Sequence, residues 1–218
     1  MKQFKKSMRT LALSSLLLCT ILSPLFASGP AVDGGKKMYK MKSEGPLYTA
    51  YNMWYEAGKE NAMWCINYKK GEMIPAGTEV TDVKLVKAES GRFLGGENTA
   101  ISFRTVEDGK EYLVNFRPIF HPNLTIEDYL DKMFTNKTFD ELTAGMNDYE
   151  INAIKEGKVK VRMSREAILV SYGYPPEHRT PDLKKDTWLY WMNRFQTKDI
   201  HFNDQDLTYR QVSDPDEL

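Results

Sequence analysis

The chain has 218 residues with 30 basic and 30 acidic side chains, and 41% of its residues are hydrophobic. This length is enough for two small domains or one mixed domain. Four basic residues and no acidic ones precede position 28, so the rest of the chain has a net charge of −4, which argues against nucleic acid as a partner.

Residues 1–27 have the pattern of a secretory signal peptide, with basic residues followed by an apolar run over 11–22. We expect cleavage after Ala27, because cleavage after Gly29 would place Pro30 at an unfavourable position. The alternative is an uncleaved anchor, although the run is short for the roughly 20 residues that a membrane span needs. The pattern predicts export across the inner membrane into the periplasm, and leaves association with the outer membrane open.

Neither cysteine is expected to carry chemistry. Leu18 is bulky where a lipoprotein signal needs a small residue, so Cys19 is interpreted as part of the apolar run. After cleavage only Cys65 remains, which excludes an intrachain disulfide. Cys65 lies between Trp64 and Ile66, where a small buried strand residue is expected. A catalytic thiol would need a histidine and an electropositive setting that the sequence does not indicate.

Residues 28–45 are expected to form a flexible leader, and residues 46–135 a first domain rich in strands. The strand-like runs 47–55 and 62–68 flank a turn that contains Gly58, which predicts a hairpin. A second hairpin is predicted where Asp108-Gly109 separates the runs 100–106 and 110–116. Together these runs predict a small barrel or a curled sheet.

The first domain is expected to end in a helix that begins after Thr125. Its apolar residues form one stripe that should pack against the barrel, namely Ile126, Tyr129, Leu130 and Met133. Residues 136–146 are then interpreted as a linker.

Residues 147–212 are interpreted as two short helices followed by a β-meander, with a tail at 213–218. Asn147 and Glu150 have the spacing of a capping box, and Gly157 is expected to end that helix. Ser164 is expected to cap the second helix, which should end at Gly173.

The run 187–195 is a predicted strand that is rich in aromatic residues. Trp188, Tyr190 and Met192 should face one way, and Leu189, Trp191 and Phe195 the other. Neither face is polar, so both should be covered at least in part. Residues 199–202 and 207–212 are predicted to complete the sheet.

The C-terminal third resembles the SmpA/OmlA family, the BamE-like small outer-membrane lipoproteins. The family pattern is Gly-Met-Ser/Thr at the start of a helix, then Leu-Gly-x-Pro, then Trp-x-Tyr on a strand, and the matching residues here are Met163, Ser164, Gly173, Pro175, Trp188 and Tyr190. Arg162 and Tyr172 depart from the pattern, because Gly and Leu are expected there. The stretch 74–80, Ile-Pro-Ala-Gly-Thr-Glu-Val, is similar to one in SH3-like barrels.

These resemblances imply an α+β fold. They imply a small SH3-like β-barrel domain followed by a BamE-like domain of two helices on a three-stranded antiparallel sheet. They also imply binding of other envelope proteins without catalysis, although fold-level likeness does not establish function.

No spacing in the sequence indicates catalytic or metal-binding chemistry. His121, His178 and His201 lack the neighbouring ligands that a metal site needs. No phosphate-binding loop, nucleophile elbow or zinc-protease motif occurs. We therefore expect no enzyme activity, no metal and no cofactor.

The aromatic residues are the remaining functional signal. The leading hypothesis is a non-enzymatic interaction or scaffold protein of the cell envelope, accessory to outer-membrane protein assembly or envelope integrity, with Trp191 and Phe195 in contact with the partner. The alternative is a module of the SH3-like domain that binds peptidoglycan in the cell wall. That module would need a groove of exposed aromatics near Tyr51, Trp54 and Tyr68. A small hydrolase or its inhibitor has the least support.

Overall fold

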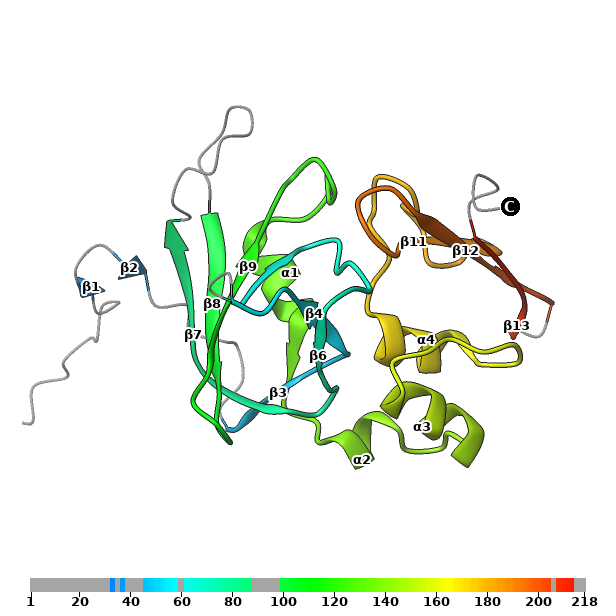
Figure 1. Ribbon diagram of the computed structural model, residues 1–218, viewed down its shortest axis with the longest axis horizontal. Coiled ribbons are helices and arrows are strands. Elements are labelled where there is room, and N and C mark those ends of the chain that lie inside the picture. The colour runs from blue at the N-terminus through cyan, green and yellow to red at the C-terminus, as the bar shows by residue number, and fades with distance from the viewer. Residues whose placement is uncertain are drawn as a thin grey trace, which may run out of the picture.

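The computed structural model describes residues 45–58, 61–87, 99–204 and 207–213, together with two short strands in the segment expected to be a leader. These strands, β1 (Val32–Asp33) and β2 (Lys36–Lys37), pair with each other. The predicted signal peptide, Cys19 and the tail beyond Ser213 lie outside the described residues. The chain folds as an α+β protein in which a curled mixed sheet lies beside a smaller sheet with two helices, as Figure 1 shows, so the predicted α+β class is confirmed.

The curled sheet has six strands in the order β10-β3-β7-β8-β9-β5. They span Phe134–Thr135 (β10), Leu47–Thr49 (β3), Glu79–Lys87 (β7), Thr99–Thr105 (β8), Glu111–Asn115 (β9) and Ala62–Trp64 (β5). All pairs are antiparallel except β5 with β9. The hairpin predicted at Asp108-Gly109 is confirmed by the pairing of β8 with β9, and Gly109 has the positive φ of +66° that such a turn favours.

The hairpin predicted from the runs 47–55 and 62–68 is present only as a single antiparallel bridge, between Glu56 and Ala62. The first run is broken at Asn52, and its second half, β4 (Met53–Tyr55), pairs with β6 (Glu72–Ile74). The second run gives β5, which instead runs parallel to β9. The physical reason is that Asn52 hydrogen-bonds to distant backbone: its N–H donates to Val170 and its side-chain amide to Ile154.

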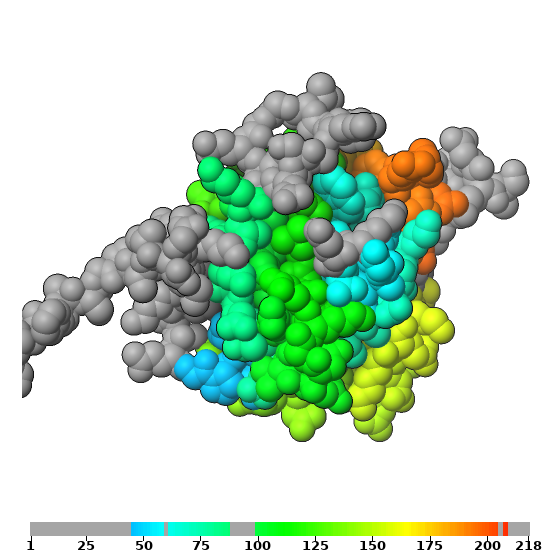
Figure 2. All heavy atoms as spheres, turned by 60° about the vertical axis from the view of Figure 1, so that its left-hand side comes forward, coloured from blue at the N-terminus to red at the C-terminus, as the bar shows by residue number. Residues whose placement is uncertain are grey.

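The predicted helix after Thr125 is α1 (Ile126–Met133). Thr125 and Asp128 form a capping box, in which each side chain accepts a hydrogen bond from the other residue's backbone. Tyr129, Leu130 and Met133 are buried in the core of the curled sheet, so the expected packing of this helix is confirmed. Figure 2 shows the outer surface of the sheet, with β7, β8 and β9 in green.

The segment expected to be a linker holds a short helix, α2 (Phe139–Leu142). Thr138 and Glu141 form another capping box there. Gly77 lies against this helix with a φ of +76°, and a Cβ at Gly77 would come within 2.6 Å of Phe139 Cβ. The segment is therefore packed against the first unit as well as connecting it to the second.

The C-terminal unit contains α3 (Asp148–Lys155), α4 (Arg165–Tyr172) and the antiparallel sheet β11-β12-β13. The strands span Thr187–Trp191, Thr197–Phe202 and Thr208–Ser213. Asn147 and Ser164 cap the helices as predicted, and Gly157 and Gly173 follow them with positive φ.

The predicted facing of the first strand is confirmed up to Trp191. Trp188 and Tyr190 are buried against the two helices, while Leu189 and Trp191 on the other face are half-buried. Phe195 is not on this strand, contrary to expectation. The strand ends at Trp191 because Asn193 forms a tight turn: its side-chain oxygen accepts from the N–H groups of Phe195 and Gln196.

Candidate functional site

A groove lies where the first unit meets the turn between β11 and β12. It has a volume of about 980 Å³. In Figure 2 the cyan segment of the first unit lies beside the orange turn, and these two parts of the chain line the groove. The described residues that line it are Trp54, Glu56, Ala57, Ala62, Met63, Trp64, Tyr68, Lys70, Asn193, Arg194, Phe195 and Gln196.

The two walls each present one exposed aromatic ring. Trp64 is 38% exposed at the end of the edge strand β5, and Phe195 is 73% exposed at the tip of the turn. Six large hydrophobic residues are exposed in the described part of the chain, and these two line the same groove. Exposed aromatic rings that gather in a hollow are typical of interaction surfaces.

Cationic side chains accompany the rings. The Arg194 guanidinium lies 4.4 Å from the centre of the Phe195 ring, and the Arg117 guanidinium lies 5.8 Å from the centre of the Trp64 ring. Lys70 is exposed and also lines the groove. Among the described residues that line the groove, Glu56 is the acidic one. Stacking on the Phe195 ring holds the Arg194 guanidinium in place, and its planar donors suit an anion.

Behind the groove, the Lys69 ammonium lies among three aromatic rings. Its nitrogen is 4.6 Å from the ring centre of Trp54, 5.2 Å from that of Tyr172 and 5.5 Å from that of Tyr190. It donates hydrogen bonds to the carbonyls of Asn67 and Tyr172, at 2.6 and 2.7 Å. Burial lowers the pKa of Lys69 well below its ordinary value of 10.5. Lys69 therefore joins the two units rather than facing a ligand.

Two asparagines fix the groove walls relative to each other. The Asn67 side-chain amide donates to the carbonyls of Asn52 and Tyr172, and its oxygen accepts from the Trp54 N–H. Asn52 continues the network, because its side-chain oxygen accepts from the Ala76 N–H. These buried polar groups are hydrogen-bonded across the junction, so rotation of one unit against the other would leave them unpaired.

The structure brings together three of the five residues that the sequence indicated. Phe195, Tyr68 and the edge of Trp54 line the groove. Trp191 does not line it; its carbonyl accepts from the Lys69 N–H, and its indole N–H is buried without a hydrogen-bond partner among the described residues. The expectation for Tyr51 is wrong, because this residue is 3% exposed in the core of the first unit, against Gly173.

Sequence reasoning missed Trp64, Lys70 and Arg194 as groove residues. A signal for Trp64 was present, because Cys65 is expected to be buried and strand alternation places Trp64 on the opposite face. No comparable signal existed for Lys70 and Arg194, since charged residues beside turns are usually only solvated.

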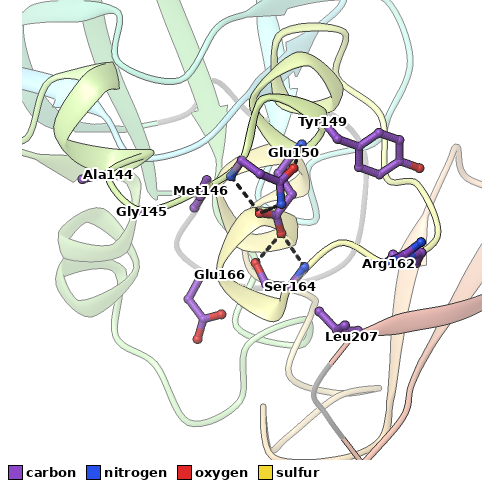
Figure 3. A pocket seen from close by; sticks show the side chains of 10 residues that line it. Ala144, Gly145, Met146, Tyr149, Glu150, Arg162, Ser164, Glu166 and Leu207 are labelled. Carbon is purple, nitrogen blue, oxygen red and sulfur yellow. Dashed lines mark hydrogen bonds between the residues drawn. The ribbon is translucent and has the colours of Figure 1, made fainter.

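A second pocket of about 860 Å³ lies where α3 and α4 begin (Figure 3). Glu150 is buried at its base, and one carboxylate oxygen accepts from the backbone and hydroxyl of Ser164, at 2.8 and 2.7 Å. The other oxygen accepts from the side-chain amide of Asn147 at 2.9 Å. Ser164 also accepts from the Ala167 N–H. The carboxylate and the hydroxyl are thus engaged in capping the two helices, which is not the arrangement of an activated nucleophile.

The only described cysteine lies in the core beside a buried histidine. Burial raises the pKa of the Cys65 thiol to about 12 and lowers the pKa of His121 to about 4. His121 Nε2 lies 3.2 Å from the Cys65 carbonyl oxygen, which also accepts from the Tyr129 hydroxyl at 2.7 Å. A thiol that stays protonated is a poor nucleophile, so these residues are interpreted as core.

Among the described residues, no cluster of three or more His, Cys, Asp or Glu side chains is placed to hold a metal ion. No helix in the same part of the chain combines the length and the apolar character needed to cross a bilayer. Comparison of the sequence and fold with protein-family models, with curated proteins and with solved structures finds no match.

Proposed function

We propose that this chain is a non-enzymatic interaction protein of the cell envelope, accessory to outer-membrane protein assembly or envelope integrity. The observation that carries the proposal is the groove in which Trp64 and Phe195, from different units, are both exposed. Rigid aromatic anchors in a hollow with cations around them are the features that protein interfaces use most. The envelope location rests on the signal-peptide pattern of residues 1–27.

The backbone at Arg162 supports the proposed BamE-like arrangement of the C-terminal unit. Arg162 stands where the SmpA/OmlA pattern has Gly, and its φ is +74°. A positive φ is the conformation in which Gly is favoured and a side chain is strained. The order of two capped helices followed by a three-stranded antiparallel sheet is the arrangement that the resemblance implies. The SH3-like description of the first unit is proposed on the curled sheet and on the stretch 74–80.

The peptidoglycan alternative has less support from the groove. Sugar recognition combines stacking on aromatic rings with hydrogen bonds from amide and hydroxyl side chains that are available for the ligand. The Asn193 and Gln196 side chains hydrogen-bond to each other, and Asn193 also holds the turn. The alternative also relied on Tyr51, which is buried. A protein partner, which needs apolar anchors and charges, fits the lining better.

A photo-crosslinking residue placed at Phe195 tests the proposal in native envelopes. We expect a defined crosslinked protein that is lost when Trp64→Ala is added. The same crosslinker at Ile119, which is 74% exposed and outside the groove, is the matched control. Equal capture of the same protein from both positions, or capture unaffected by Trp64→Ala, would contradict the proposal.

A further inference from the structure

The charges of the groove narrow the class of partner that fits it. We infer that the groove binds an acidic, extended segment of a partner protein, in which carboxylates are interspersed with apolar side chains; this inference rests on the proposed function. Lys70 and Arg194 line the groove and Arg117 lies against Trp64, while Glu56 is the acidic residue in the described lining. The chain after residue 27 has a formal net charge of −4, so the two cations against one acidic residue in the described lining are a local feature.

The geometry of Arg194 suits a carboxylate of the partner. Its guanidinium stacks 4.4 Å from the Phe195 ring centre, and the turn that carries both residues is held by Asn193. The planar donors of an arginine match the two oxygens of a carboxylate, and stacking reduces the entropy that binding would cost. An apolar partner side chain next to that carboxylate would then contact Phe195 or, across the groove, Trp64.

Both kinds of contact are needed to account for the lining. The rings alone would suit any apolar segment, and the cations alone would suit any anion. Lys70 on the first unit and Arg194 on the turn line the groove together with the apolar residues Met63, Trp64 and Phe195. A segment that places carboxylates on either side of apolar residues would satisfy both walls, and opposite charges at the rim would speed and orient its association.

Fluorescence anisotropy on the full mature chain tests the inference. The probe is a short fluorescein-labelled peptide in which Glu alternates with Phe and Leu, and its counterpart carries Lys in place of Glu. We expect saturable binding of the Glu peptide, weakened by added salt because the charges are exposed. Lys70→Glu combined with Arg194→Glu should weaken binding by roughly tenfold or more. Lys137→Glu combined with Lys184→Glu, two exposed lysines outside the groove, is the matched control and should leave binding unchanged.

The aromatic contacts separate failure of this inference from failure of the proposed function. Phe195→Ala should weaken binding by roughly thirtyfold if the ring is an anchor, whereas Ile119→Ala should have no effect. If the Lys peptide binds as well as the Glu peptide and both depend on Phe195, the acidic partner is overturned and the groove remains a protein-binding site. The inference is overturned if the Glu peptide shows no saturable binding. It is also overturned if a soluble peptidoglycan fragment displaces the Glu peptide at a lower concentration than unlabelled peptide does. If the crosslinker at Phe195 captures no protein in envelopes from the otherwise unchanged chain, the proposed function is overturned as well.

Discussion

Acid should destabilise the fold through one buried histidine. His121 is 1% exposed. Its ring stacks beside Phe116, with 6.2 Å between the ring centres, and lies close to the ring of Tyr129. Burial lowers its pKa to about 4 from 6.5, and positive charge at His178 and Lys132 adds to the shift. The unfolded chain therefore takes up a proton at a higher pH than the folded chain does.

The sign and size of the effect follow from these two values. Above pH 6.5 the ring is neutral in both states, and His121 costs nothing. Between 6.5 and about 4 the unfolded state is protonated first, so stability falls as the pH falls. The full loss is about 3 kcal/mol, since each unit of pKa is worth about 1.4 kcal/mol, and most of it should be reached by about pH 4.5.

His121→Phe removes the titrating group and keeps an aromatic ring in the site. Urea unfolding monitored by tryptophan fluorescence gives the free energy of unfolding at about pH 7.5 and at about pH 4.5. Other groups respond to acid in both proteins, so the decisive quantity is the difference between them. We expect the variant to lose about 2.5 kcal/mol less than the wild type. His201→Gln, which removes a histidine from the C-terminal sheet, is the control. If His121→Phe loses as much stability as the wild type, burial of a neutral His121 is wrong.

Four further outcomes are expected in thermal or urea unfolding. Trp188→Ala should cost about 3–5 kcal/mol, because a side chain that is 1% exposed is deleted from the C-terminal core; a loss below about 1 kcal/mol would contradict that packing. Arg162→Gly should stabilise the fold by about 1 kcal/mol by relieving a positive φ, whereas Arg162→Ala, which keeps a Cβ, should not. Glu150→Ala should cost about 2–3 kcal/mol by leaving Ser164 and Asn147 donors without acceptors, and Glu150→Gln should cost less; equal costs would refute the capping role. Burial lowers the pKa of Lys69, so the cost of burying its charge in the folded state declines as the pH rises toward 10.5. The wild type should therefore gain stability relative to Lys69→Met between about pH 7 and about pH 9.5. A constant difference in the free energy of unfolding would show that the ammonium is solvated.

Local signals in the sequence identified the elements whose causes are local. The capping boxes at Thr125 and Asn147, the Asp108-Gly109 hairpin and the alternation of Trp188 with Leu189 each depend on residues a few positions apart. The facing of Trp188 and Tyr190 also followed from strand periodicity alone.

The errors occurred where distant partners decide the structure. The first predicted hairpin is limited to one bridge, because Asn52 bonds to Ile154 and Val170, residues about half the chain away that no local pattern reveals. Phe195 leaves the strand because one side chain, Asn193, closes a turn inside an aromatic run. The groove was only half anticipated for the same reason, since its walls come from segments that the sequence does not place together.

The strand order also governs when the chain is able to fold. β3 pairs with β10 from the far end of the first unit, and β5 joins the sheet only beside β9. The Asn52 side chain forms its hydrogen bond only after the Ile154 carbonyl, 102 positions later in the sequence, has been synthesised. Long closures of this kind slow folding, because loop entropy is lost before the contacts form. A chain that is synthesised from its N-terminus therefore exposes Trp64 without the facing turn at 193–196 until the last third has been made, and that interval is when a chaperone would bind it.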